Sequence, residues 1–152
     1  MQLRTIKFPG LPDAYTVTDT LEDSANPGCY YRIVNGQVQW CNPPMAVNTE
    51  YRLADRYMGH PVYGMLLDFG NMPNNSYKEL TMGVGDLTVI DVQGICESAG
   101  QVYEFPVVNN SGEAVAWHYT RNGAAGDFIQ LWTRGDYSSA RAHFFIRYIK
   151  EG

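Results

Sequence analysis

An Asn-Gly dipeptide between two alternating stretches constrains the fold of this chain more than any other feature. The stretch CYYRIV-NG-QVQWC, residues 29–41, places Asn35 and Gly36 at its centre. Asn-Gly favours a two-residue type I′ turn, because both central residues of that turn need positive φ angles. Side chains alternate across a strand, so one face of the predicted hairpin is apolar, and we assign that face to the core. The residues on it are Tyr31, Ile33, Val38 and Trp40.

The same hairpin argues against a disulfide in this region. Cys29 falls on the apolar face and Cys41 on the opposite one, whereas a disulfide needs both Cβ atoms on one side, within about 4.5 Å. The chain has three cysteines, an odd number. We therefore expect three reduced thiols, in keeping with synthesis in a reducing cytosol.

The rest of the chain alternates between strand-like runs and turn signals. Strands spaced by about 8–12 residues are typical of a sandwich or a barrel. A capping-box pattern at Ser76–Glu79 precedes two glycines and no 3.6-residue period, so we expect no helix there. The predicted fold is an all-β, antiparallel, jelly-roll-like β-sandwich with little or no helix. Its predicted strands are 49–57, 62–70, 87–92, 101–108, 114–120, 127–133 and 140–149.

Three details of this pattern predict where strands lie in the sheets. Residues 62–70 are apolar on both faces until Asp68, which favours a central strand. Pro106 lies within 101–108 and cannot donate to a ladder, which favours an edge strand or a strand end. The segment from Gly94 to Gly100 is interpreted as a turn-like break.

A chain of 152 residues suits one domain. We interpret residues 1–14, with two Pro-containing turns, as an irregular lead-in. Residues 15–152 form the predicted β-sandwich. Within it, 15–48 supply the N-terminal strands with the Asn35-Gly36 hairpin, and 49–150 supply the remainder.

Composition excludes several partners. The net charge is −5 and no run of basic residues exists, which argues against nucleic acid. No apolar run approaches 18 residues and the start lacks an apolar signal segment, so we expect no membrane insertion and no secretory signal. Charged residues are only 18% and there are eleven tyrosines, whose rings need a core, a subunit interface or a binding site.

The sequence contains no recognisable catalytic or metal-binding motif. The histidines, His60, His118 and His143, lie in separate segments without ligand spacing, and we predict no metal and no cofactor. No Gly-x-Ser-x-Gly elbow exists, and Cys96 is the most loop-like thiol. We therefore expect no enzyme activity. A pair of carboxylates for glycoside cleavage stays open as an alternative. Its candidates are Asp86, Asp91, Glu97, Asp127 and Asp136.

A cluster of aromatic and polar residues near the C-terminal end is the predicted ligand-binding site. Flat aromatic faces and planar polar groups suit sugars. The alternative for Trp117, Tyr119 and Trp132 is a place in the core or in a subunit interface. The predicted binding residues are Trp117, His118, Tyr119, Arg121, Asp127, Arg134, Asp136 and Tyr137.

Residues 49–150 resemble a module found near the C-termini of bacteriophage and prophage tail-fibre or minor structural proteins. The likeness rests on turn residues in order, and on a closing strand pair around a Gly-Asp-x-Ser loop. Met82-Gly83 stands where that module often has His-Gly, and residues 1–48 lie outside it. The matching positions are Arg56, Tyr57, Gly59, Pro61, Val62, Tyr63, Asp68, Phe69, Gly70, Pro73, Asn74, Ile90, Asp91, Gly135, Asp136, Ser138, Tyr148 and Lys150.

The resemblance implies a homotrimeric receptor-binding head on a virion fibre, made in the cytoplasm of a bacterial host. It implies attachment to a host cell-surface glycan and contacts with other virion tail proteins, and three weak sites would add avidity. Two alternatives stay open. One is a structural virion protein, such as a capsid decoration or fibre connector, and the other is a tail-associated glycan hydrolase or esterase.

Overall fold

The computed structural model describes residues 3–7, 14–108, 114–121 and 126–150, which fold into two β-sheets. The described residues contain no helix, and so none that is long and apolar enough to cross a membrane. Almost all strand pairs are antiparallel, which confirms the predicted β-sandwich class.

The larger sheet holds ten strands. Its neighbours are antiparallel except for β5 and β6, which meet in one parallel bridge between Trp40 and Leu53. A short strand, β3 (Leu21–Glu22), pairs with β4 beside the main path. In spatial order the others are β1 (Leu3–Lys7), β2 (Ala14–Thr18), β4 (Tyr30–Val34), β5 (Gln37–Trp40), β6 (Glu50–Tyr57), β7 (His60–Asn71), β14 (Arg141–Lys150), β9 (Leu87–Ser98) and β10 (Gln101–Glu104).

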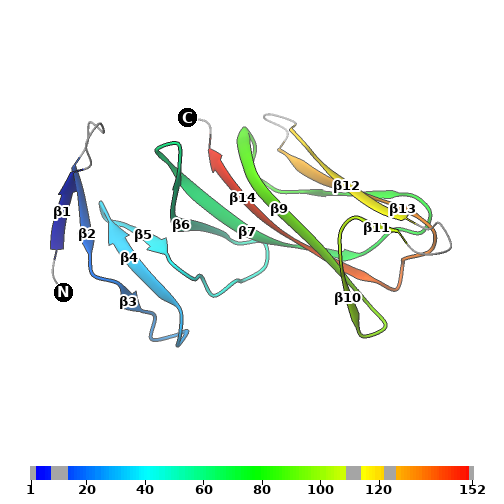
Figure 1. Ribbon diagram of the computed structural model, residues 1–152, viewed down its shortest axis with the longest axis horizontal. Helices are drawn as coiled ribbons and strands as arrows, with labels where there is room; N and C mark the ends of the chain where they lie inside the picture. Colours follow the sequence, from blue (N-terminus) through cyan, green and yellow to red (C-terminus); the bar gives the residue numbers. More distant parts are fainter. Residues whose placement is uncertain (1–2, 8–13, 109–113, 122–125, 151–152) are drawn as a thin grey trace.

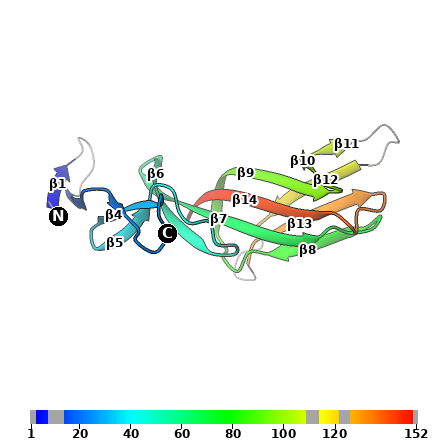
Figure 2. The ribbon, with the colours of Figure 1, turned by 90° about the horizontal axis from the view of Figure 1, so that it is seen from below.

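The smaller sheet holds four strands and lies at the same end of the molecule as β9 and β14, whereas β1 to β5 lie at the opposite end (Figures 1 and 2). In spatial order the strands are β11 (Val107–Val108), β12 (Ala114–Thr120), β13 (Phe128–Arg134) and β8 (Tyr77–Thr81). The chain crosses from β10 to the smaller sheet at Phe105-Pro106. The single strand predicted over 101–108 is therefore wrong, because the chain changes sheets inside it, but both of its parts, β10 and β11, are edge strands.

The main core lies between the two sheets. β7 is central, with β6 and β14 as its neighbours, as the apolar pattern of residues 62–70 predicts. Phe144 of β14 is fully buried, with ring centroids 5.7 Å from Phe69, 5.5 Å from Phe105 and 5.6 Å from Trp117. Rings from both sheets therefore meet on one residue, which is how the interface between the layers is filled.

Gly94 lies inside β9, so the predicted break from Gly94 to Gly100 is wrong. A Cβ atom at Gly94 would lie 2.6 Å from atoms of both the Phe105 and Phe144 rings. The glycine is thus a site of close ring approach within a continuous strand. The turn comes later, at Ala99 and Gly100, which both have positive φ angles.

The register of the predicted hairpin is confirmed, but its core face is not. Tyr31 pairs with Trp40 and Ile33 with Val38, around Asn35 and Gly36 with φ angles of 50° and 76°. Among the described residues, the smaller sheet lies at the other end of the molecule and does not cover this face, where Tyr31, Ile33 and Trp40 are only half-buried. Val38 is 44% exposed. The buried side chains of the hairpin lie on the opposite face, and they are Val34 and Gln39.

Further differences concern turns and termini. Residues 3–7 form β1, paired in register with β2, so an irregular lead-in over 1–14 is wrong for its described part. The predicted Pro-containing turns at 8–13 lie outside the described residues. The turn after β6 is two residues, Met58 and Gly59, so the four-residue gap predicted between strands 49–57 and 62–70 is too long, and the exposed His60 opens β7.

Candidate functional site

The eight residues predicted to bind a ligand do not form one site. Trp117, His118 and Tyr119 lie within β12, and the loops after β12 and after β13, beside which the others lie, flank β13, a strand of seven residues. At about 3.3 Å per residue, the loops lie roughly 20 Å apart at opposite ends of that strand. Arg121 is exposed beside the first loop and Arg134 beside the second. The predicted cluster is therefore wrong as a single constellation.

Asp127 is a structural residue at the first of these ends. Its side chain is completely buried, and one carboxylate oxygen accepts a hydrogen bond from the Tyr119 hydroxyl. The backbone N–H of Leu87 lies 3.4 Å from the same oxygen. The backbone of Asp127 also bonds to Met82 and Val84, at 2.8 and 3.0 Å. Asp127 thus fastens the 82–87 segment to the β12–β13 hairpin and cannot contact a ligand.

The other predicted aromatic residues pack inward. Trp117 packs edge-on against Phe144, and Tyr137 packs against the main core. Asp136 accepts hydrogen bonds from the backbone N–H and the hydroxyl of Ser138, at 3.0 and 2.7 Å. These bonds lower the pKa of Asp136 and close the loop after β13. Trp117 therefore follows the alternative interpretation, that of a core residue.

Cys96 is also unsuited to act as a catalytic nucleophile. It lies within β9 and is 2% exposed. Burial raises the pKa of its thiol, which disfavours the nucleophilic thiolate. All three cysteines are free thiols.

A different candidate binding surface lies on the outer face of the smaller sheet, which is the face that points away from the core. Three strands contribute alternate residues to it, and the register aligns them in three rows. Ala116, Trp132 and Tyr77 form the first row. His118, Gln130 and Glu79 form the second. Thr120, Phe128 and Thr81 form the third. We call these nine residues the outer face.

Two large aromatic side chains dominate the first row. Trp132 is 46% exposed and Tyr77 is 62% exposed, and they are cross-strand neighbours. On its other side Trp132 pairs with Ala116, which carries only a methyl group. Side chains directly opposite one another are about 5 Å apart at Cβ, so the two rings share one stretch of surface. The first row therefore exposes two neighbouring aromatic rings to solvent, and the small Ala116 side chain lies next to Trp132.

The second row supplies planar polar groups beside the rings. The Gln130 amide nitrogen donates a hydrogen bond of 2.8 Å to the Glu79 carboxylate. His118, exposed on β12, pairs with Gln130 from the other side. A carboxylate has about four lone-pair sites and an amide has two N–H donors, so this pair can bond further partners. Of the eight predicted residues, His118 belongs to the outer face, and Arg134 follows Trp132 on the same face of β13.

One sequence signal for the outer face is the alternation of residues along β13. Phe128, Gln130 and Trp132 alternate with buried Ile129 and Leu131 along β13. The neighbouring strand was harder to find. Tyr77–Thr81 was excluded as a helix but was not predicted as a strand, so Tyr77 and Glu79 had no assigned face.

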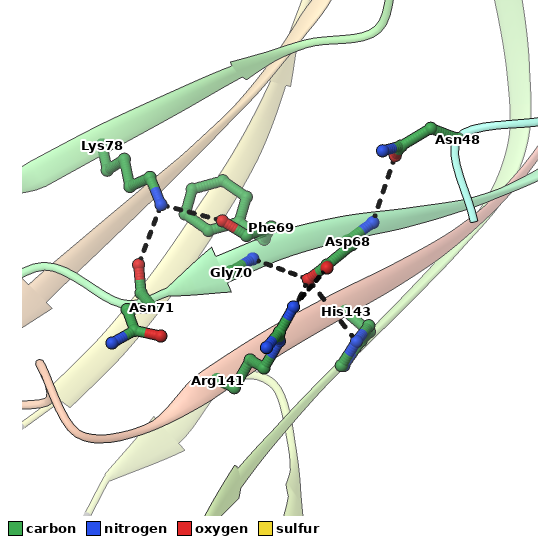
Figure 3. A network of polar contacts seen from close by, with 8 residues as sticks. All are labelled: Asn48, Asp68, Phe69, Gly70, Asn71, Lys78, Arg141 and His143. Atoms are coloured by element: carbon green, nitrogen blue, oxygen red, sulfur yellow. Dashed lines mark hydrogen bonds and ion pairs between the residues drawn. The ribbon is translucent and has the colours of Figure 1, made fainter.

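A second polar cluster lies on the larger sheet (Figure 3). The Arg141 guanidinium donates to Asp68 at 2.5 Å, and His143 lies 3.5 Å from the same carboxylate. The Gly70 N–H donates to Asp68 at 2.9 Å, and the Asp68 N–H donates to Asn48 at 3.3 Å. The Arg141 hydrogen bond, first among these contacts, lowers the pKa of Asp68.

This second cluster serves as a clamp. It joins β7, β14 and the segment before β6 at the point where a bulge shifts the register after Ala142. None of the contacts of Asp68 is a hydroxyl or a thiol that could act as a nucleophile. No group of three or more His, Cys, Asp or Glu side chains among the described residues could hold a metal ion.

Comparison with known proteins found no matching family model, no similar curated protein and no similar solved structure.

Proposed function

We propose that this chain is a receptor-binding domain that attaches to a host cell-surface glycan through the outer face, as the head of a phage tail fibre. The observation that carries the proposal is the exposure of Trp132 and Tyr77 side by side on the smaller sheet. The two exposed rings are removed from water only when a partner covers them, so an exposed aromatic pair of this kind marks a binding surface.

The chemistry of the outer face supports a sugar as that partner. The C–H face of a pyranose ring can stack on Trp132, while its hydroxyl groups bond to planar polar groups. Glu79 and Gln130 provide such groups in the next row, held side by side by their own hydrogen bond. Neighbouring residues within a row are about 5 Å apart across strands, and successive rows are about 7 Å apart along the strands, which suits one or two sugar rings.

The inference that the glycan belongs to a bacterial host rests on the resemblance of residues 49–150 to phage tail-fibre modules. That resemblance supports a bacterial surface polysaccharide as the receptor. A glycan hydrolase receives no support from Asp127, because that carboxylate is buried and engaged with Tyr119.

A glycan array of bacterial capsular and lipopolysaccharide oligosaccharides tests the proposal. We expect the labelled full chain to bind one or more of these glycans, and to release no product from them on prolonged incubation. A full chain that is folded by circular dichroism but binds no glycan on the array would contradict the proposal. Release of sugar products would instead favour the hydrolase.

A further inference from the structure

The larger sheet ends in an edge that is largely open. β9 has twelve residues and pairs with β14 from Leu87 to Glu97. On its other side β10 pairs only with residues 95–98. Beyond β10, one further bond joins the Phe105 N–H to the Gly94 carbonyl at 2.9 Å. Within the described residues, residues 89–93 of β9 therefore have no strand beside them on this side.

The backbone of this segment is oriented for strand addition. The Gly94 carbonyl faces the open side, because it accepts from Phe105. Backbone groups two residues apart in a strand point the same way, so the N–H and C=O of Val92 face the open side as well. An unpaired strand edge of this kind is a template for another extended chain.

A small cavity lies at the end of the open edge. It has a volume of about 220 Å³, below the range of about 300–1,000 Å³ typical of small-molecule sites. Strand addition commonly places alternate side chains in such pockets. The β9–β10 hairpin also exposes apolar side chains, with Ile95 at 39%, Val102 at 63% and Tyr103 at 39%, and Ile95 lines the cavity. The residues lining the cavity are Val92, Gln93, Gly94, Ile95, Glu104 and Phe105.

Charge indicates which strand fits this edge. β9 and β10 contain three carboxylates, Asp91, Glu97 and Glu104, and no lysine or arginine. β1 has the sequence LRTIK, with Arg4 and Lys7 and no carboxylate. It is the other terminal strand of the same sheet, and β2 is its one strand partner among the described residues.

We propose that β1 of a second copy pairs with the open edge of β9, joining the larger sheets of two chains head to tail. The strand cannot come from the same chain, because β1 and β9 lie at opposite ends of the molecule (Figure 1). Contacts of this kind use two different surfaces of each copy, so they close into rings or extend as filaments. The proposal does not depend on the glycan-binding function.

Two changes on the β9 side test the contact. Val92→Pro removes the outward N–H donor, and the combined Asp91→Lys and Glu104→Lys changes place like charges against β1. Combined Arg4→Glu and Lys7→Glu changes do the same from the β1 side. We expect each to weaken self-association roughly tenfold or more, measured by sedimentation over a concentration series.

A chain with the charges exchanged between the two strands provides a second test in case one of these variants folds poorly. A chain carrying all four charge changes again has opposite charges at the contact, and we expect it to regain self-association. Arg134→Glu, an exposed change on the smaller sheet, is the matched control and is expected to leave it unchanged. A wild-type chain that stays monomeric throughout the series would overturn the proposal. So would oligomers that none of the β1 or β9 changes weakens, or a four-change chain that stays dissociated although folded.

Discussion

Trp117 and Trp132 lie on neighbouring strands, one residue apart in register, yet have opposite environments. Trp117 pairs with Leu131, and Trp132 pairs with Ala116. The Trp117 ring points inward, and its centroid lies 5.6 Å from that of Phe144, whereas Trp132 points outward and is 46% exposed. One residue of register therefore separates a ring that stabilises the fold from a ring that is available for binding.

Replacing each tryptophan by alanine should separate the two roles. Trp117→Ala leaves a cavity against Phe144, and we expect a loss of about 3 kcal/mol or more in the free energy of unfolding. Trp132→Ala removes an exposed ring, and we expect a change within about 0.5 kcal/mol. Urea unfolding measures both. Equal losses in the two variants would mean that Trp132 is also a core residue.

The same contrast between faces applies to two tyrosines. Tyr119→Phe removes the hydroxyl that donates to buried Asp127, so an acceptor is left without this donor inside the protein. We expect a loss of about 1–3 kcal/mol in unfolding free energy. Tyr77→Phe on the outer face is the matched control and should change stability by less than about 0.5 kcal/mol. If Tyr119→Phe matched that control, the hydrogen bond to Asp127 would contribute nothing to stability.

The contrast explains how far sequence reasoning could go. The hairpin at Asn35-Gly36 was predicted to its register, because turn chemistry is local. Which face of that hairpin is buried depends on a distant second sheet, and for Val38 the prediction was wrong. The outer face depends on β13 pairing with β8, whose Gln130 and Glu79 are separated by 51 residues in sequence. The aromatic residues of β12, Trp117 and Tyr119, face the core, whereas those of β13, Phe128 and Trp132, face away from it, so alternation within one strand could not say which ring was exposed.

The clamp at Asp68 lies on the larger sheet, and removing its charge should cost less stability than either Trp117→Ala or Tyr119→Phe. Its folded pKa is lowered mainly by Arg141, so its contribution to stability is present above the pKa of the unfolded chain and is lost as the pH falls through the lowered folded value. We expect Asp68→Asn to lower stability at neutral pH by up to about 1 kcal/mol.

The dependence of stability on pH tests whether the ionised Asp68 carboxylate is the source of this contribution. The gap in stability between the wild-type chain and Asp68→Asn should narrow as acid is added, in thermal unfolding at a series of pH values. A gap that stays constant to the lowest pH would show that the ionised carboxylate is not its source. Glycan binding at neutral pH should be unchanged in this variant.

The central claim is that the outer face binds a glycan, and titration calorimetry of the array-selected glycan tests it most directly. The matched pair is Trp132→Ala and Tyr57→Ala, since Tyr57 is similarly exposed, at 43%, but lies beside the turn between β6 and β7. We predict that Trp132→Ala weakens binding at least about tenfold, or about 1.4 kcal/mol, and that Tyr57→Ala binds like the wild-type chain. A folded Trp132→Ala variant with wild-type affinity would contradict the account.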